Sequence, residues 1–88
     1  MKLYHCTTPK KIERYRRTGF IIAPVRGWKW LNSAQSWCKK TGRTIVLEIE
    51  CDVAYPLPDH KPLYHSYWTP EDIKSWKIIK SHGQKNET

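Results

Sequence analysis

The sequence predicts a small α+β fold, in which a mainly antiparallel sheet, continuous or split, accompanies two main helices and one short helical turn. Apolar residues occur in short runs that suit strands. Two longer segments carry apolar residues at helical spacing, and each ends at a glycine, Gly19 or Gly42. The chain has 88 residues, the size of one domain. We assign residues 1–80 to a single compact domain and 81–88 to a disordered polar tail.

The first elements are a strand and a helix. Residues 2–6 read as a strand, and residues 9–17 as a helix whose first position is a proline, where that residue fits well. Thr8 is placed to cap this helix. Ile12 and Tyr15 lie three residues apart and would therefore face the core.

The middle of the chain predicts a second helix between two less regular segments. Residues 20–23 form an apolar run that we interpret as a strand, and residues 24–32 as a loop or irregular strand. Asn32 or Ser33 would cap the next helix. Its inward face would carry Ala34, Trp37 and Cys38.

The second half of the chain is mostly extended. Residues 43–51 alternate apolar and polar side chains and predict a half-buried strand. Residues 52–63 contain three prolines and predict a loop, whereas 64–68 suit a strand. A threonine, a proline and two acids at 69–72 predict a short helical turn. Residues 76–79 would form the last strand.

Positive charge is concentrated in the first half of the chain. The net charge is +8; residues 1–43 hold eleven Lys and Arg against one acid, and residues 44–88 hold five Lys against seven acids. A positive half raises the local concentration of anions. We therefore expect a phosphate-bearing ligand, either a nucleotide or RNA. For any single residue, a solvated helix face is an equally good explanation.

The remaining composition narrows the class of protein. No run of eighteen apolar residues is present, so we expect no membrane-spanning helix and no membrane partner. The three cysteines, Cys6, Cys38 and Cys51, are an odd number without close spacing. They predict reduced thiols and a cytoplasmic location, although a bridge between two of them would also be compatible with the count. The spacing of cysteines and histidines predicts no metal site.

Two places stand out as candidate functional sites. His5 lies where the first strand gives way to the first helix, and side chains at such junctions often face an open crevice. Arg26, Gly27, Trp28 and Trp30 place a guanidinium, a permissive glycine and two indoles within five positions. Structural roles compete with these interpretations: a capping histidine, a surface arginine and two core tryptophans.

Four segments, in this order, resemble those of the ADP-ribosyltransferase-like superfamily, which includes the poly(ADP-ribose) polymerases, several bacterial toxins and the tRNA 2′-phosphotransferases. They are Leu3-Tyr4-His5-Cys6-Thr7, the step Gly19-Phe20-Ile21, the stretch from Trp28 to Trp37, and Thr69-Pro70-Glu71-Asp72-Ile73. The resemblance implies an NAD-binding domain that transfers ADP-ribose to protein or nucleic acid, or a degenerate form of it.

The resemblance also implies roles for individual residues. His5, the candidate catalytic residue, and Thr7 would hold the adenosine ribose of NAD, and Trp28 or Trp30 would stack on nicotinamide. Arg26 would bind a phosphate, as arginine does in the phosphotransferase branch. The family's late-strand glutamate has no counterpart, because its expected position falls near Tyr64 or His65.

Two other functions fit the same residues. A small, non-catalytic RNA-binding module would use the basic half together with the interleaved rings of Tyr15, Trp28, Trp30 and Trp37. A toxin or immunity-type protein would instead use exposed tryptophans as anchors for a protein partner.

Overall fold

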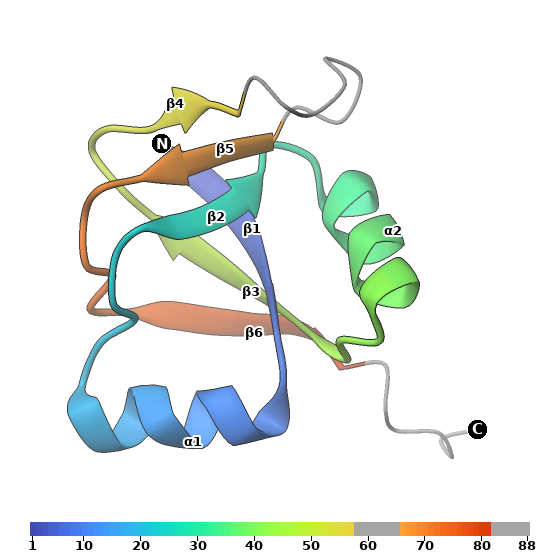
Figure 1. Cartoon of the computed structure of the whole chain (residues 1–88), viewed down its shortest axis with the longest axis horizontal. Helices are drawn as coiled ribbons and strands as arrows, with labels where there is room; N and C mark the ends of the chain where they lie inside the picture. The colour runs from blue at the N-terminus through green and yellow to red at the C-terminus, as the bar shows by residue number, and fades with distance from the viewer. Residues whose placement is uncertain (58–65, 82–88) are drawn as a thin grey trace.

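The computed structural model describes residues 1–57 and 66–81, which form two helices and six strands (Figure 1). In chain order these are β1 (Lys2–Thr7), α1 (Pro9–Thr18), β2 (Val25–Trp28), α2 (Leu31–Thr41), β3 (Ile45–Glu50), β4 (Tyr55–Pro56), β5 (Ser66–Thr69) and β6 (Trp76–Ser81). One sheet holds the strands in the order β4-β5-β2-β1-β3-β6, and every neighbouring pair is antiparallel. The predicted α+β class is therefore confirmed.

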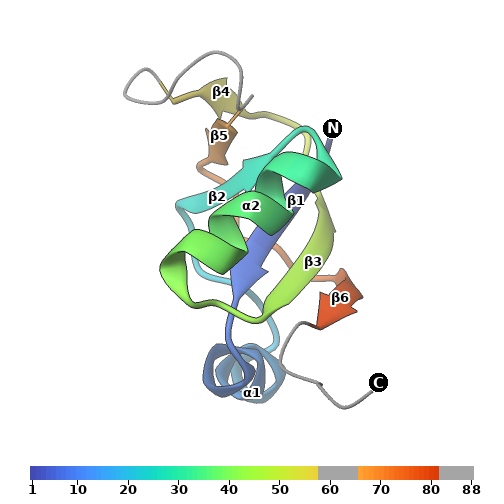
Figure 2. The ribbon, with the colours of Figure 1, turned by 90° about the vertical axis from the view of Figure 1, so that its right-hand side faces the viewer.

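Two clusters of buried side chains occupy the two faces of the sheet. On one face, α1 contributes Ile12 and Tyr15 to a core that includes Leu3, Leu47 and Ile49. On the other face, α2 packs over β1, β2 and β3 (Figure 2) and closes a cluster of Cys6, Trp28, Ala34, Cys38 and Val46. Successive strand residues point to opposite faces, so β1 contributes side chains to both clusters.

The ends of α1 follow the local sequence signals. The Thr8 side chain accepts a hydrogen bond from the backbone N–H of Lys11 at 3.3 Å, and proline occupies the first turn. The helix ends at Gly19, whose φ of 89° lies in the left-handed region that glycine adopts without steric cost. Ile12 and Tyr15 are buried, as their spacing predicts.

The start of α2 differs from the prediction. Its N-cap is Trp30 rather than Asn32 or Ser33, and the Trp30 side chain makes no capping hydrogen bond. The helix begins there because the preceding strand, β2, ends at Trp28 and the chain turns immediately afterwards. The other end behaves as predicted, since Gly42 takes the left-handed conformation and its N–H bonds the carbonyl of Cys38.

Three of the predicted segments form other structures. Residues 20–23 are not a strand; only Ile21 pairs, through an isolated bridge to Ile73. The segment 24–32, predicted as a loop or irregular strand, contains the regular strand β2 between β5 and β1. The predicted loop 52–63 contains β4, which pairs with β5. β2 and β4 form through pairing with strands that are distant in the sequence, which the local sequence does not encode.

Residues 69–72 form no helical turn. Thr69 ends β5, and its hydroxyl accepts a hydrogen bond from the backbone N–H of Glu71 at 3.2 Å, which makes a turn instead. The Glu71 carboxylate accepts hydrogen bonds from the backbone N–H groups of Asp52 and Val53, at 2.9 and 2.6 Å. The acid thus holds the loop before β4 rather than a helix N-terminus.

The strand predicted at 43–51 is β3, and it is more buried than expected. Its alternation places Ile45, Leu47 and Ile49 in the core, but Val46, on the other face, is also fully buried because α2 covers it. The last strand extends to Ser81. The rest of the predicted tail, 82–88, lies outside the described residues, as do Tyr64 and His65, where the family's glutamate was expected.

Candidate functional site

A pocket forms where β1 and β2 separate. The two strands pair at Tyr4 and Trp28. From this pair β1 continues toward α1, whereas the Val25 end of β2 lies away from β1 (Figure 1). The pocket has a volume of about 280 Å³. Its lining residues are His5, Cys6, Lys11, Pro24, Arg26, Trp28, Trp37 and Arg43. The site therefore draws on both helices and on the two strands between them.

His5 bridges the gap between the diverging strands. Its Nδ1 lies 2.7 Å from the backbone carbonyl oxygen of Arg26, and its Nε2 lies 3.4 Å from the hydroxyl of Tyr15. A carbonyl oxygen only accepts, so Nδ1 carries the proton and donates it to Arg26. In the neutral ring Nε2 is then the acceptor, and it faces a hydroxyl. These contacts set both the tautomer and the orientation of the imidazole.

A buried pair of hydroxyls lies beneath the imidazole. Thr7 is fully buried, and its Oγ1 lies 3.1 Å from the hydroxyl of Tyr15. The Tyr15 ring in turn packs edge-on against Trp76, with centroids 5.8 Å apart. Thr7 therefore does not line the pocket. It contacts the ring that supports His5.

Three cations converge on the pocket from three parts of the fold. Lys11 comes from α1, Arg26 from β2, and Arg43 from the segment between α2 and β3. Burial first, and then the charges of Lys11 and Arg43, lower the pKa of His5 from its ordinary value of 6.5; the hydrogen bond to the Arg26 carbonyl opposes this shift. The imidazole is therefore neutral at pH 7.

No carboxylate lines the pocket in the part of the chain that the structure describes. Glu48 lies 3.7 Å from the ammonium of Lys2, and Glu50 lies 3.2 Å from the N-terminal ammonium. Glu71 accepts the backbone hydrogen bonds described above. These three acids are thus engaged elsewhere, and no acid among the described lining residues balances the charges of the three pocket cations.

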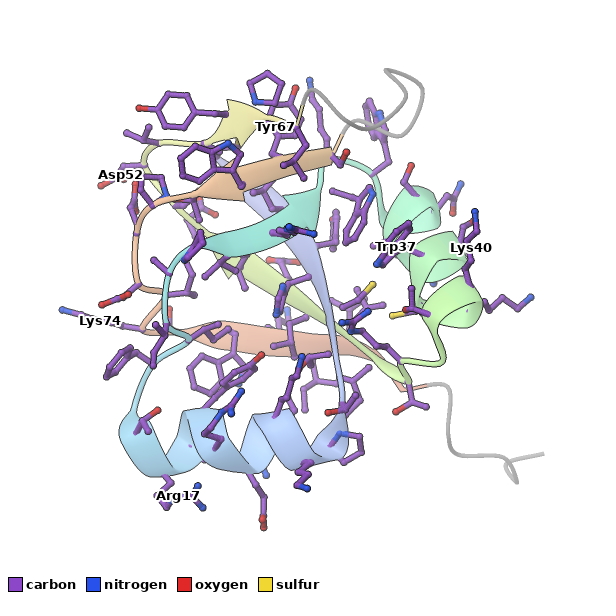
Figure 3. All side chains as sticks on the ribbon, in the orientation of Figure 1. Arg17, Trp37, Lys40, Asp52, Tyr67 and Lys74 are labelled. Atoms are coloured by element: carbon purple, nitrogen blue, oxygen red, sulfur yellow. The ribbon has the colours of Figure 1, made fainter. Side chains whose placement is uncertain are left out.

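Two indoles form one wall. Trp28 is 4% exposed and packs against Trp37, with ring centroids 5.6 Å apart and planes tilted by 36°. Trp37 projects from α2 toward the sheet (Figure 3). Trp28 is thus a core residue that also contributes to the pocket wall, and its stacking on a ligand stays a prediction.

The structure brings together three of the five predicted site residues: His5, Arg26 and Trp28 line one pocket. Thr7 lies underneath it. Trp30 lies outside, at the start of α2, where 51% of its surface is exposed and Lys29 Nζ lies 5.6 Å from its ring centroid. Whether the pocket binds NAD stays a prediction.

Sequence reasoning missed Lys11 and Arg43 as site residues. Both belong to the positive half of the chain, and that imbalance was the signal for them. It could not single them out among eleven cations, because their convergence depends on where β1 and β2 separate.

Cys6 contributes a thiol to the pocket wall. It is 6% exposed, and its Sγ donates to the carbonyl oxygen of Ala34 at 3.0 Å. Burial raises the pKa of this thiol, and burial likewise raises the pKa values of the Cys38 and Cys51 thiols. All three are free cysteines. A protonated, buried thiol is a poor nucleophile, so Cys6 shapes the wall rather than reacting.

Comparison with protein-family models, curated proteins and solved structures finds no match to this chain. Within residues 1–57 and 66–81, no group of His, Cys, Asp and Glu side chains is arranged to hold a metal ion. None of the described helices has the length and apolar character needed to cross a membrane.

Proposed function

We propose that this protein binds a nucleotide of the NAD type and that the cationic pocket holds its phosphate groups. The observation that supports this proposal is the convergence of Lys11, Arg26 and Arg43 beside His5, with no acid among the described lining residues. Uncompensated cations around a concave site favour an anion. Two of the three are arginines, whose planar guanidinium can contact a phosphate through two N–H groups at once.

The size of the pocket limits which part of the ligand it takes. Sites for small molecules usually enclose about 300–1,000 Å³, and this pocket, at about 280 Å³, lies at the lower end. It suits a diphosphate with one adjoining ribose better than a whole dinucleotide. The remainder of the ligand would lie along the surface next to the pocket.

Binding fits the site better than transfer of ADP-ribose. Cleaving the bond to nicotinamide develops positive charge on the ribose, and a transferase stabilises that charge with a negative group. The described lining offers cations and a neutral imidazole instead. His5 therefore acts in this proposal as a hydrogen-bonding residue, and the resemblance to ADP-ribosyltransferases supplies the ligand class rather than the reaction.

Calorimetric titration with NAD and with ADP-ribose tests the proposal. Arg43→Gln and Arg26→Gln each remove a charged hydrogen-bond donor, and such bonds contribute about 1.5–3 kcal/mol. We therefore expect each variant to weaken binding by roughly 10- to 150-fold. Lys74→Gln is the matched control, because Lys74 is an exposed cation that does not line the pocket and lies on the opposite side of the molecule from the pocket residue Trp37 (Figure 3). Equal affinities for the parent, Arg43→Gln and Lys74→Gln, or no binding at millimolar ligand, would refute the proposal.

RNA is a second candidate ligand, and the solvent side of α1 favours it. Lys10, Arg14 and Arg17 are exposed and lie on successive turns of the helix that also supplies Lys11 to the pocket. A strand with a phosphate in the pocket would have further cations along its path. Affinity for a short oligonucleotide should then fall steeply with salt and should fall again in Arg14→Gln. A salt-independent affinity would exclude this candidate.

A further inference from the structure

A row of side chains leads away from the pocket across three strands. Arg26 of β2 lies directly opposite Trp68 of β5, and Trp68 lies directly opposite Tyr55 of β4. Residues directly opposite each other in an antiparallel pair project from the same face of the sheet. Arg26 lines the pocket, so the row starts at the phosphate site and continues as two aromatic rings.

The two rings are accessible. The ring centroids of Tyr55 and Trp68 are 5.2 Å apart, with planes tilted by 38°. Tyr55 is 47% exposed and Trp68 is partly exposed. α2 lies over β1, β2 and β3 on this face and leaves β5 and β4 beyond its edge (Figure 2). The aromatic pair therefore lies beside Arg26 in the sheet, without a covering element among the described residues.

We propose that Trp68 and Tyr55 form a stacking subsite for the nucleobase of the ligand whose phosphate the pocket holds. This inference rests on the proposed function and deepens it. Neighbouring strands are about 4.8 Å apart, so the rings lie one and two strand spacings from Arg26. In a nucleotide a single ribose separates phosphate from base, which matches this short step. Aromatic rings stack on any base, because every base has a π-face.

The other tryptophans fit this role less well. Trp28 is 4% exposed and packs against Trp37. Trp30 is exposed, but it lies at the start of α2 with Lys29 near its ring, and unlike Trp68 it is not paired across the sheet with a residue of the pocket. The subsite thus replaces Trp28 and Trp30 as the expected stacking residues with a pair that the sequence did not single out.

The test compares ligands with and without a base. Adenosine 5′-monophosphate and ribose 5-phosphate carry the same phosphate and ribose, and only the first has a base. Trp68→Leu keeps an apolar side chain in place and removes the aromatic face. Removing one stacking ring weakens binding by roughly 5- to 150-fold. We expect that loss for adenosine monophosphate and no change for ribose 5-phosphate, with Trp68→Phe restoring most of the affinity.

Two further variants keep the test decisive. Tyr55 lies on the exposed edge strand β4, and Tyr55→Leu replaces Trp68→Leu in the test if circular dichroism shows that Trp68→Leu does not fold. We expect Tyr55→Leu also to weaken the binding of adenosine monophosphate. Trp30→Leu is the matched control and should leave both affinities unchanged. The inference is overturned if neither Trp68→Leu nor Tyr55→Leu alters the preference for adenosine monophosphate, or if Trp30→Leu lowers it.

The same measurements separate this inference from the proposed function. Suppose that both ligands bind, that Arg43→Gln weakens the binding of both, and that the aromatic variants change neither affinity. The phosphate pocket is then supported and the stacking subsite is refuted. If neither ligand binds, the proposed function itself fails. A titration with tetra-adenylate identifies the source of the base. If tetra-adenylate binds more tightly than the mononucleotide and loses the same affinity in Trp68→Leu, the subsite binds a base of a nucleic-acid strand. Equal binding with that loss supports it for a free nucleotide.

Discussion

Removing the hydroxyl of Tyr15 should destabilise the protein by leaving another buried hydroxyl without a partner. Thr7 is fully buried, and its Oγ1 lies 3.1 Å from the Tyr15 hydroxyl. Tyr15 itself is only 5% exposed, so water does not readily replace it. A buried polar group that loses its partner costs about 1–3 kcal/mol. Tyr15→Phe should therefore lower the free energy of unfolding by about that amount.

A double-mutant cycle isolates the contribution of the Thr7–Tyr15 hydroxyl pair to the free energy of unfolding. In Thr7→Val the Thr7 hydroxyl is replaced by a methyl group of similar shape. In the Tyr15→Phe background, Thr7→Val removes the hydroxyl that has lost its partner, so Thr7→Val should hardly change the free energy of unfolding there. The two single changes should therefore add up to more than the double change, by about 1 kcal/mol.

Urea unfolding followed by circular dichroism measures all four proteins of the cycle. Tyr55→Phe is the control, because its ring lies at an exposed sheet edge, and the free energy of unfolding should change by less than about 0.5 kcal/mol. Additive single-variant losses in the cycle would show that the two hydroxyls are not coupled. The inferred chain of contacts from Thr7 through the Tyr15 hydroxyl to His5 would then be wrong.

Three other predictions follow from the same contacts. The pKa of His5 in the folded protein lies below 6.5, so the unfolded chain takes up the proton first as the pH falls. The free energy of unfolding should therefore fall as the pH drops through 6.5 and level off below the folded-state pKa. In His5→Asn, a plot of the urea midpoint against pH should be flatter over this range. Gly27→Ala should cost about 1–3 kcal/mol in the same assay, because the new Cβ would lie 2.8 Å from Leu3 Cβ; an unchanged stability would contradict that close approach of β2 to β1. Glu71→Ala should speed amide exchange at Asp52, whose N–H loses its acceptor, whereas equal protection in both proteins would show that the carboxylate does not hold the loop.

The elements with strong local signals were the predictable ones. Thr8 and Gly19 mark the two ends of α1 through side-chain capping and a positive φ, which depend on neighbouring residues alone. β2 and β4 were not assigned as regular strands, because they are short and exist through pairing with β5. The turn at Thr69 was misjudged because a threonine followed by a proline starts a turn as readily as a helix.

The candidate site was predictable in part for a similar reason. His5 and Arg26 could be singled out from strand ends and composition, and both line the pocket. Lys11 and Arg43 could not, since they line the same pocket only after both helices have packed. Trp30 illustrates the converse: its position in an aromatic segment suggested a ligand contact, but the turn into α2 places it outside the pocket.

The most direct test of the phosphate pocket is the pKa of His5, followed by NMR in the free protein and at saturating NAD. The diphosphate of NAD stays ionised over the pH range in which an imidazole titrates. The account predicts a free value below 6.5 and a higher value with ligand, because the bound diphosphate offsets the repulsion from Lys11 and Arg43. Superimposable titration curves with and without NAD would contradict it.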